Sequence, residues 1–200
     1  MIVAGTGVAR VSRACEQRLL YSAVLEMPLD LETFAPTRGF TAEELSKYGV
    51  RVEEDTVEIP ILGRGGTWYS RVHLPDGDPK YEGPKGMASH LFNPLGLGPG
   101  TDEVWIAEGE FDTLSLVVAG IPALGVLGAG NFNRHWALLF EHAEIVIAFD
   151  PDQAGNAQAE KLAQLWEPGQ VSRFDPSPYE DLNDWFRQDR AAFQAAVLAW

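Results

Sequence analysis

The stretch Glu144-Ile-Val-Ile-Ala-Phe-Asp-Pro-Asp-Gln-Ala-Gly155 decides the fold. Its apolar, β-branched first half predicts a short strand that is buried on both faces, over residues 144–149. Two aspartates, Asp150 and Asp152, come directly after this strand, and residues 153–166 then have a helical pattern. Gly155 permits close packing where that helix begins. The stretch therefore predicts a strand–loop–helix unit with two carboxylates at the end of a buried strand.

The same arrangement occurs twice more. A predicted strand at 103–107 runs into Glu108-Gly-Glu-Phe-Asp112, and one at 170–174 is followed by Glu180-Asp-Leu-Asn-Asp184. Strands that alternate with helices of this length predict an α/β fold with right-handed crossovers and a parallel sheet. Ligands bind such sheets outside the carboxyl ends of the strands. We therefore expect one edge of the sheet to gather Glu108, Asp112, Asp150, Asp152 and Asp181.

The remaining elements of residues 101–200 follow from the same periodicity. The pattern predicts helices at 111–119, 131–141, 179–188 and 190–199, and a further strand at 122–127. The glycines of Gly125-Val-Leu-Gly-Ala-Gly130 form either a plain loop or a loop whose amides approach a phosphate. Their spacing is not that of a dinucleotide-binding fold.

Residues 1–100 divide into two further parts. Residues 1–36 predict a helical lead-in, with a helix at 11–25 and no evident chemistry. Residues 37–100 predict a small α+β subdomain with a linker at 94–100. That subdomain starts with the capping box Thr41-Ala-Glu-Glu44, on a helix expected to end at Gly49. A hairpin of strands 56–62 and 67–74 follows.

Charge is distributed unevenly along the chain. The formal net charge is −14 in 200 residues, and residues 101–200 carry 5 Lys and Arg against 16 Asp and Glu. Closely spaced carboxylates stay ionised together only when a cation lies among them, and all-oxygen ligands favour Mg²⁺, with Mn²⁺ as a substitute. A bound cation would invert the local field, so the acidity does not exclude a polyanionic ligand.

Each acidic motif also has a purely structural interpretation. Asp152 and Asp181 could simply cap helices, and acids near Gly109 could respond only to the helix dipole. We expect Glu110 to be a cap or a surface residue and Asp184 to be structural. Among the basic residues, Arg71, Lys80 and Lys85 could hold nucleotide or template by charge and Tyr81 by stacking, or could be solvated loop residues.

Several functional classes are excluded. The single Cys15 rules out an internal disulfide framework and a multi-cysteine zinc site. The sequence has neither a Walker A motif nor Gly-x-Ser-x-Gly, and no histidine has ligand spacing. No apolar run reaches the roughly 18 residues of a membrane span, and no signal-peptide pattern is present, so we expect a cytoplasmic protein.

Taken together, residues 103–190 resemble the Toprim domain that DnaG-type primases share with topoisomerases and some nucleases. The resemblance rests on Glu108-Gly with Asp112, then Asp150-Pro-Asp152 with Gly155, then Asp181 after a further strand. Upstream, Arg38-Gly-Phe-Thr-Ala-Glu43, Ile59-Pro-Ile61, Lys80-Tyr81 and Leu91-Phe-Asn93 are similar to the basic subdomain that precedes Toprim in those primases. Asn183 stands where many primases have a second acid, which removes one possible ligand or supporting charge.

The resemblance implies a Toprim-like parallel sheet flanked by helices, and synthesis of RNA primers from NTPs on single-stranded DNA with Mg²⁺. It makes Asp150 and Asp152 the main metal ligands, Glu108 a ligand or general base, and Asp112 and Asp181 supporting ligands. The residues that would hold NTP or template are Arg71, Lys80, Tyr81 and Lys85. With no zinc module and no helicase domain, the chain is similar to a phage- or plasmid-type catalytic core that works beside a separate helicase or template-recognition subunit. Two alternatives stay open, namely a metal-dependent Toprim nuclease and a non-catalytic module that binds nucleotide or metal.

Overall fold

The computed structural model describes residues 29–53, 56–62, 68–73, 81–82, 90–93, 96–97 and 100–200. The predicted helix at 11–25, Cys15, Lys80 and Lys85 lie outside the described residues. Within the described part of the chain, none of the helices combines the length and the apolar character that crossing a membrane requires.

The C-terminal half is built on a four-stranded parallel sheet. Its strand order is β6-β5-β7-β8, with β5 at Glu103–Ala107, β6 at Ala123–Gly125, β7 at Glu144–Ala148 and β8 at Val171–Arg173. Central strands β5 and β7 pair in register from Glu103 opposite Glu144 to Ala107 opposite Ala148. The predicted parallel α/β sheet is thus confirmed, and the carboxyl ends of β5 and β7 lie level with each other.

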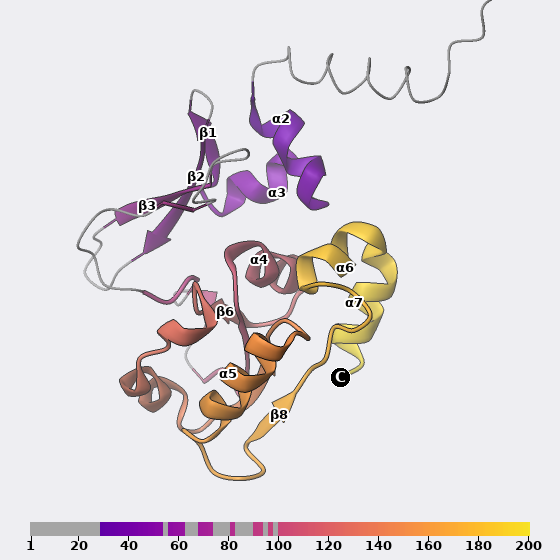
Figure 1. Ribbon diagram of the computed structural model, residues 1–200. Coiled ribbons are helices and arrows are strands. Elements are labelled where there is room, and N and C mark those ends of the chain that lie inside the picture. The colour runs from indigo at the N-terminus through magenta and orange to yellow at the C-terminus, as the bar shows by residue number, and fades with distance from the viewer. Residues whose placement is uncertain are drawn as a thin grey trace, which may run out of the picture.

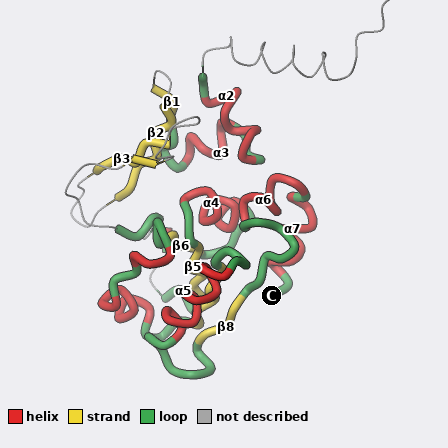
Figure 2. Tube along the Cα trace, in the orientation of Figure 1, coloured by secondary structure: helices red, strands yellow, loops and turns green. Residues whose placement is uncertain are grey.

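Both faces of this sheet are covered. Trp105 and Val146 belong to one apolar cluster, while their strand neighbours Ile106 and Ile147 belong to another, because successive side chains of a strand point to opposite faces. The first cluster includes α4 at Glu110–Val118, α6 at Leu182–Gln188 and α7 at Arg190–Leu198. The second includes α5 at Gln153–Ala163. Figure 2 shows helices on both sides of the strands.

One predicted helix is replaced by two shorter turns. Residues 131–141 do not form an α-helix, because the chain adopts 3₁₀ turns η3 at Ala129–Asn131 and η4 at Arg134–Phe140. Asn131 donates its side-chain amide to the Leu127 carbonyl, and the Asn133 side chain accepts from the His135 amide. Such local bonds compete with a continuous helix, and periodicity does not detect them.

The N-terminal elements form a second, antiparallel sheet. Its strands are β1 at Arg51–Glu53, β2 at Thr56–Leu62, β3 at Trp68–His73 and β4 at Tyr81–Glu82, in that order. The predicted hairpin is the β2–β3 pair, with Val57 opposite His73 and Leu62 opposite Trp68. Before the sheet lie α2 at Leu31–Phe34, η1 at Ala35–Arg38 and α3 at Ala42–Lys47.

The N-terminal elements pack directly on α6 and α7. The predicted Thr41–Glu44 capping box is present, and Glu44 also forms an ion pair with Arg190. Phe40 stacks on Phe186 with ring centroids 4.8 Å apart. In Figure 1 the antiparallel sheet with α2 and α3 lies above α4 and α6. The proposed boundaries at 36/37 and 100/101 therefore separate segments that share one apolar core, which spans Phe34 to Val197.

Candidate active site

The carboxyl edge of the parallel sheet carries an acidic pocket. Glu108 follows β5, Asp150 follows β7, and Asp112 and Asp181 come from the starts of α4 and α6. All four line one pocket of about 310 Å³. The structure therefore brings together four of the five carboxylates predicted from the sequence.

Asp112 is held in place by a backbone hydrogen bond from α6. It lies in the first turn of α4, and its Oδ1 accepts a hydrogen bond of 3.0 Å from the Asn183 amide. Burial raises the pKa of Asp112 well above its usual range, and the charges of Asp181 and Asp150 raise it further. Burial and the neighbouring negative charges both disfavour the ionised form of this carboxyl group, and a cation among the acids would favour it.

Asp150 is half-buried beside the other acids. Burial is the largest cause that raises the pKa of Asp150 to about 7, followed by the charge of Glu108. The charges of Asp181 and Asp152 act in the same direction, and only the Arg173 guanidinium opposes them. Neighbouring charges contribute to both shifts because these acids lie within electrostatic reach of one another.

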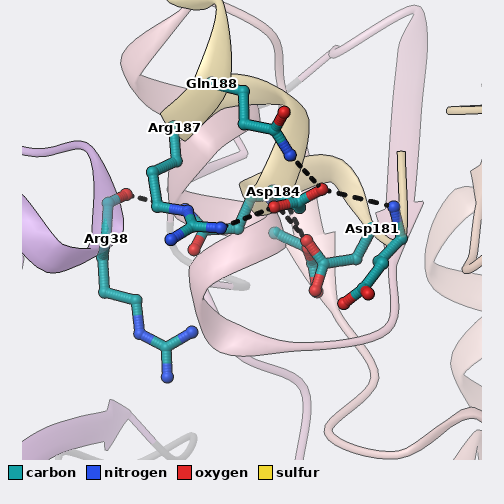
Figure 3. Close-up of polar contacts among 8 residues, drawn as sticks. Arg38, Asp181, Asp184, Arg187 and Gln188 are labelled. Atoms are coloured by element: carbon teal, nitrogen blue, oxygen red, sulfur yellow. Dashed lines mark hydrogen bonds and ion pairs between the residues drawn. The ribbon is translucent and has the colours of Figure 1, made fainter. Parts of the chain in front are cut away.

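Asp181 and Asp184 organise the start of α6. The Asp181 side chain accepts from the Asp184 amide and caps the helix. Asp184 accepts from Arg187 at 2.8 Å and from Gln188 at 2.7 Å, and these bonds hold the pKa of Asp184 below its usual range. Figure 3 shows Arg187 and Gln188 pointing toward the Asp184 carboxylate. Asp184 thus contacts α6 itself, as expected of a structural residue.

Asp152 has a different position. It is the N-cap of α5, where its Oδ1 accepts from the Gly155 amide at 2.7 Å. It is not among the pocket-lining residues, although its charge acts on Asp150. The hydrogen bond to Gly155 therefore confirms that Asp152 caps α5. Its role as a metal ligand stays a prediction.

The prediction for Glu110 was wrong. Glu110 is only 3% exposed and lines the acidic pocket from the first position of α4. Its place in the sequence resembles an ordinary dipole-stabilising acid, and only the approach of the neighbouring elements buries it.

The donor set fits a hard divalent cation. Four carboxylates supply all-oxygen ligation. Burial and mutual repulsion raise the pKa values of Asp112 and Asp150, and a bound cation would relieve the repulsion. Across the residues that the structure describes, no three His, Cys, Asp or Glu side chains already form a group that could hold a metal ion. Binding therefore requires side-chain adjustment among the four acids.

Two basic residues contribute to the site, and neither was given a role from the sequence. Arg38 of η1 lines the acidic pocket, with its guanidinium carbon 4.9 Å from the centre of the Phe111 ring. In the sequence, a position next to Gly39 at the end of a short turn gives little indication that Arg38 is a site residue. Its role becomes evident only from the fold. Of the four predicted nucleotide-binding residues, Arg71 and Tyr81 lie on β3 and β4 and their side chains are not described, so their roles stay predictions.

Arg173 braces the loop that carries Asp150. Its guanidinium donates to the Phe149 carbonyl at 2.8 Å and the Asp150 carbonyl at 3.1 Å. It also donates to Ile147, Phe174 and Asn156. A planar fork with five donors suits this set of acceptors, which a lysine ammonium cannot match.

We predict that Arg173→Lys lowers the free energy of unfolding by about 2 kcal/mol, because several backbone carbonyls at the end of β7 lose their charged donor. Urea unfolding measures this change. Arg134→Lys is the matched control, because Arg134 is exposed on η4, and its effect should stay below about 0.5 kcal/mol. Equal effects of the two substitutions would contradict a bracing role for Arg173.

The raised pKa values also predict how stability depends on pH. In the unfolded chain Asp150 ionises near its usual value of 3.8, whereas in the folded protein it resists ionisation until about pH 7. The folded state binds more protons across this window, so stability of the metal-free protein should fall as pH rises from about 4 to 7. Asp112 shifts in the same direction.

Urea unfolding in EDTA at pH 5, 6, 7 and 8 tests this expectation. The midpoint should decline between pH 5 and pH 7, and Mg²⁺ should raise it more at pH 8 than at pH 5. The pKa values of Glu44 and Asp184 are lowered by folding, so these groups change the stability only at more acidic pH. They do not affect the range from pH 5 to pH 7. A midpoint that rises between pH 5 and 7 would contradict the assignment.

Comparisons with known proteins agree on one family and fold. Residues 105–186 match a family described as Toprim-like. The gene 57 protein of Mycobacterium phage D29 is 34% identical over 112 residues, which are 55% of this chain and 72% of that protein.

Solved structures of primases share the fold. The primase fragment of the bacteriophage T7 primase-helicase protein superposes with a TM-score of 0.68 at 22% identity, over 82% of this chain and 72% of that one. The RNA polymerase domain of Mycobacterium tuberculosis primase DnaG gives a TM-score of 0.63 at 18% identity, over 94% of this chain and 82% of that one.

Proposed function

The chain belongs to the Toprim-like family and has the fold of a DnaG-type primase core, and from this premise we propose that it is a primase-like nucleotidyltransferase. It synthesises short RNA primers from NTPs on single-stranded DNA. The observation that carries the proposal is the pocket in which Glu108, Asp112, Asp150 and Asp181 meet Arg38. Acids on one wall and a guanidinium from another element suit a metal-bound triphosphate better than a neutral ligand.

The predicted acids and Arg38 have different tasks in this proposal. Glu108, Asp150 and Asp152 are the catalytic acids, and Asp112 and Asp181 support them as ligands. Mg²⁺, when bound, neutralises charge on the reacting phosphates and aligns them for in-line attack. Glu108 acts either as a ligand or as the base that accepts the proton of the primer 3′-hydroxyl. Arg38 contacts phosphate oxygens from the opposite side.

The partners of the fold relatives support this substrate class. One T7 structure contains primase domains bound to an RNA/DNA hybrid and dTTP together with the lagging-strand polymerase, and one M. tuberculosis DnaG structure contains duplex DNA with a 6-nucleotide overhang. We propose that this chain likewise binds a DNA template and NTPs and acts beside a separate helicase or template-recognition subunit. Arg71, Lys80, Tyr81 and Lys85 are the proposed contacts to nucleotide or template.

One incubation tests the proposal. The purified chain is mixed with single-stranded DNA, labelled NTPs and Mg²⁺ or Mn²⁺, in parallel with Glu108→Gln. New oligoribonucleotides that disappear in the variant are the expected result. Shortened DNA would instead support the nuclease, and nucleotide binding without any product, even after a helicase is added, would support the non-catalytic module.

A further inference from the structure

Asn183 is a buried polar residue at the junction of three elements. It lies on α6 and is 4% exposed. Its amide nitrogen donates to the Arg38 carbonyl at 2.9 Å and to the Ser115 hydroxyl at 3.1 Å. Ser115 in turn donates its own proton to the Phe111 carbonyl at 2.8 Å. The Ser115 oxygen therefore acts as an acceptor toward Asn183, and both contacts require a donor at position 183.

The backbone of the same residue reaches the acidic cluster. The Asn183 amide donates to Asp112 Oδ1, so one residue fixes an acid of the pocket and the carbonyl of Arg38. Both residues line the pocket and come from different elements, Asp112 from α4 and Arg38 from η1. An aspartate has the same shape as asparagine, but when ionised it offers no donor to either acceptor.

The packing around Arg38 leaves little freedom for η1 to adjust. Gly39 has a φ of 79°, and a Cβ there would lie 2.8 Å from the Arg187 Cα. The aromatic stack of Phe40 on Phe186 anchors the following residue. These contacts hold η1 close to α6, and Asn183 adds a hydrogen bond from α6 to the Arg38 carbonyl. An apolar residue at 183 would leave the part-buried Arg38 carbonyl without this donor, which favours displacement of the segment.

We propose that Asn183 is a positioning residue that fixes the position of Arg38 of η1 relative to the acids of the pocket. It thereby sets the affinity of the pocket for the nucleoside triphosphate. The inference rests on the proposed function for the identity of that ligand. The side-chain amide of Asn183 then aligns two elements that line one pocket. From the resemblance to primases, a carboxylate that acts on metal would be expected at this position.

The test compares Asn183→Leu with Gln170→Met, which is a matched loss of an amide. Gln170 donates its side-chain amide to the carbonyls of Glu141 and Ala143, before β8 at the end of the sheet away from the pocket. Three quantities are measured on each folded variant: hydrogen–deuterium exchange at residues 35–40, equilibrium binding of a fluorescent ATP analogue with Mg²⁺, and kcat for nucleotide incorporation.

For Asn183→Leu we expect at least tenfold faster exchange at residues 35–40 and at least tenfold weaker nucleotide binding, with a smaller change in kcat. Gln170→Met should change all three less than twofold, even where its melting temperature falls as far. If Asn183→Leu does not fold, Ser115→Ala removes one of the two acceptors and should weaken nucleotide binding two- to fivefold.

Equal behaviour of the Asn183 and Gln170 variants would overturn the inference and leave Asn183 as a packing residue. Exchange at residues 35–40 and binding that both stay within twofold of the parent chain would do the same. A parent chain that binds nucleotide but makes no primer contradicts the proposed function alone, because exchange and binding still decide the role of Asn183. A parent chain that binds no nucleotide contradicts both proposals.

Discussion

Replacing Asp150 with asparagine is expected to reduce nucleotide incorporation at least about 1,000-fold while it stabilises the metal-free protein at pH 8. The loss follows because the neutral amide no longer supplies a charged ligand at the end of β7, and metal stabilisation of the transition state contributes several kcal/mol. The stability gain follows from the raised pKa of Asp150. At pH 8 the folded protein keeps this charge half-buried and close to Glu108 and Asp181, and asparagine removes both the cost of burying the charge and the repulsion.

Two measurements separate these effects. Primer extension under saturating Mg²⁺ gives the activity, and urea unfolding in EDTA at pH 5 and pH 8 gives the stability. The gain should be present at pH 8 and reduced at pH 5, where Asp150 is already protonated in the folded state. Glu160→Gln makes the same change of charge on the exposed face of α5 and should alter neither quantity. An Asp150→Asn variant that keeps its activity would remove Asp150 from the proposed catalytic set.

The sequence correctly predicted which edge of the sheet carries the site, because the end of a strand can be recognised from neighbouring residues alone. The runs before Glu108 and Asp150 are short and continuously apolar with β-branched residues, which is typical of buried parallel strands. Parallel strands align their carboxyl ends, so the convergence of these acids needed only the fold class. The capping box of α3 was predictable for the same reason, since Thr41 and Glu44 satisfy each other within one turn. The helix predicted at 131–141 failed because two asparagines bond to nearby backbone, which competes with helix periodicity.

The remaining site residues depend on contacts between distant segments. Arg173 meets the Asp150 carbonyl across neighbouring strands, and Asn183 meets the Arg38 carbonyl across 145 positions of sequence. No local pattern distinguishes these residues from other polar residues near helix or strand ends. Glu110 was misassigned for the same reason, because its burial comes from elements that approach it from elsewhere. Positions of acids could be predicted from the sequence, whereas the residues that hold those acids in place could not.

Gly155→Ala is expected to destabilise the protein by about 2–4 kcal/mol and to reduce kcat/KM at least about 100-fold. Helix propensity alone predicts the opposite sign, because alanine favours a helix over glycine by about 1 kcal/mol. The close approach of the Asp150 backbone reverses this. A Cβ at position 155 would overlap the Asp150 carbonyl oxygen and lie 3.1 Å from its carbon and 3.2 Å from its nitrogen. Backbone atoms cannot rotate away as a side chain can.

Relief of this overlap must move either the start of α5 or the Asp150 loop. The Asp152 cap on the Gly155 amide resists the first movement, and the Arg173 bond to the Asp150 carbonyl resists the second. Displacement of Asp150 by even about 1 Å is enough for the expected loss of activity. Gly130→Ala is the control, because the nearest atom to a Cβ there is the Gln158 side-chain nitrogen at 3.9 Å. Urea unfolding and primer extension of both variants measure the effects. A stabilised, active Gly155→Ala protein would show that helix propensity prevails over the packing of Asp150 and that this loop is not tightly held.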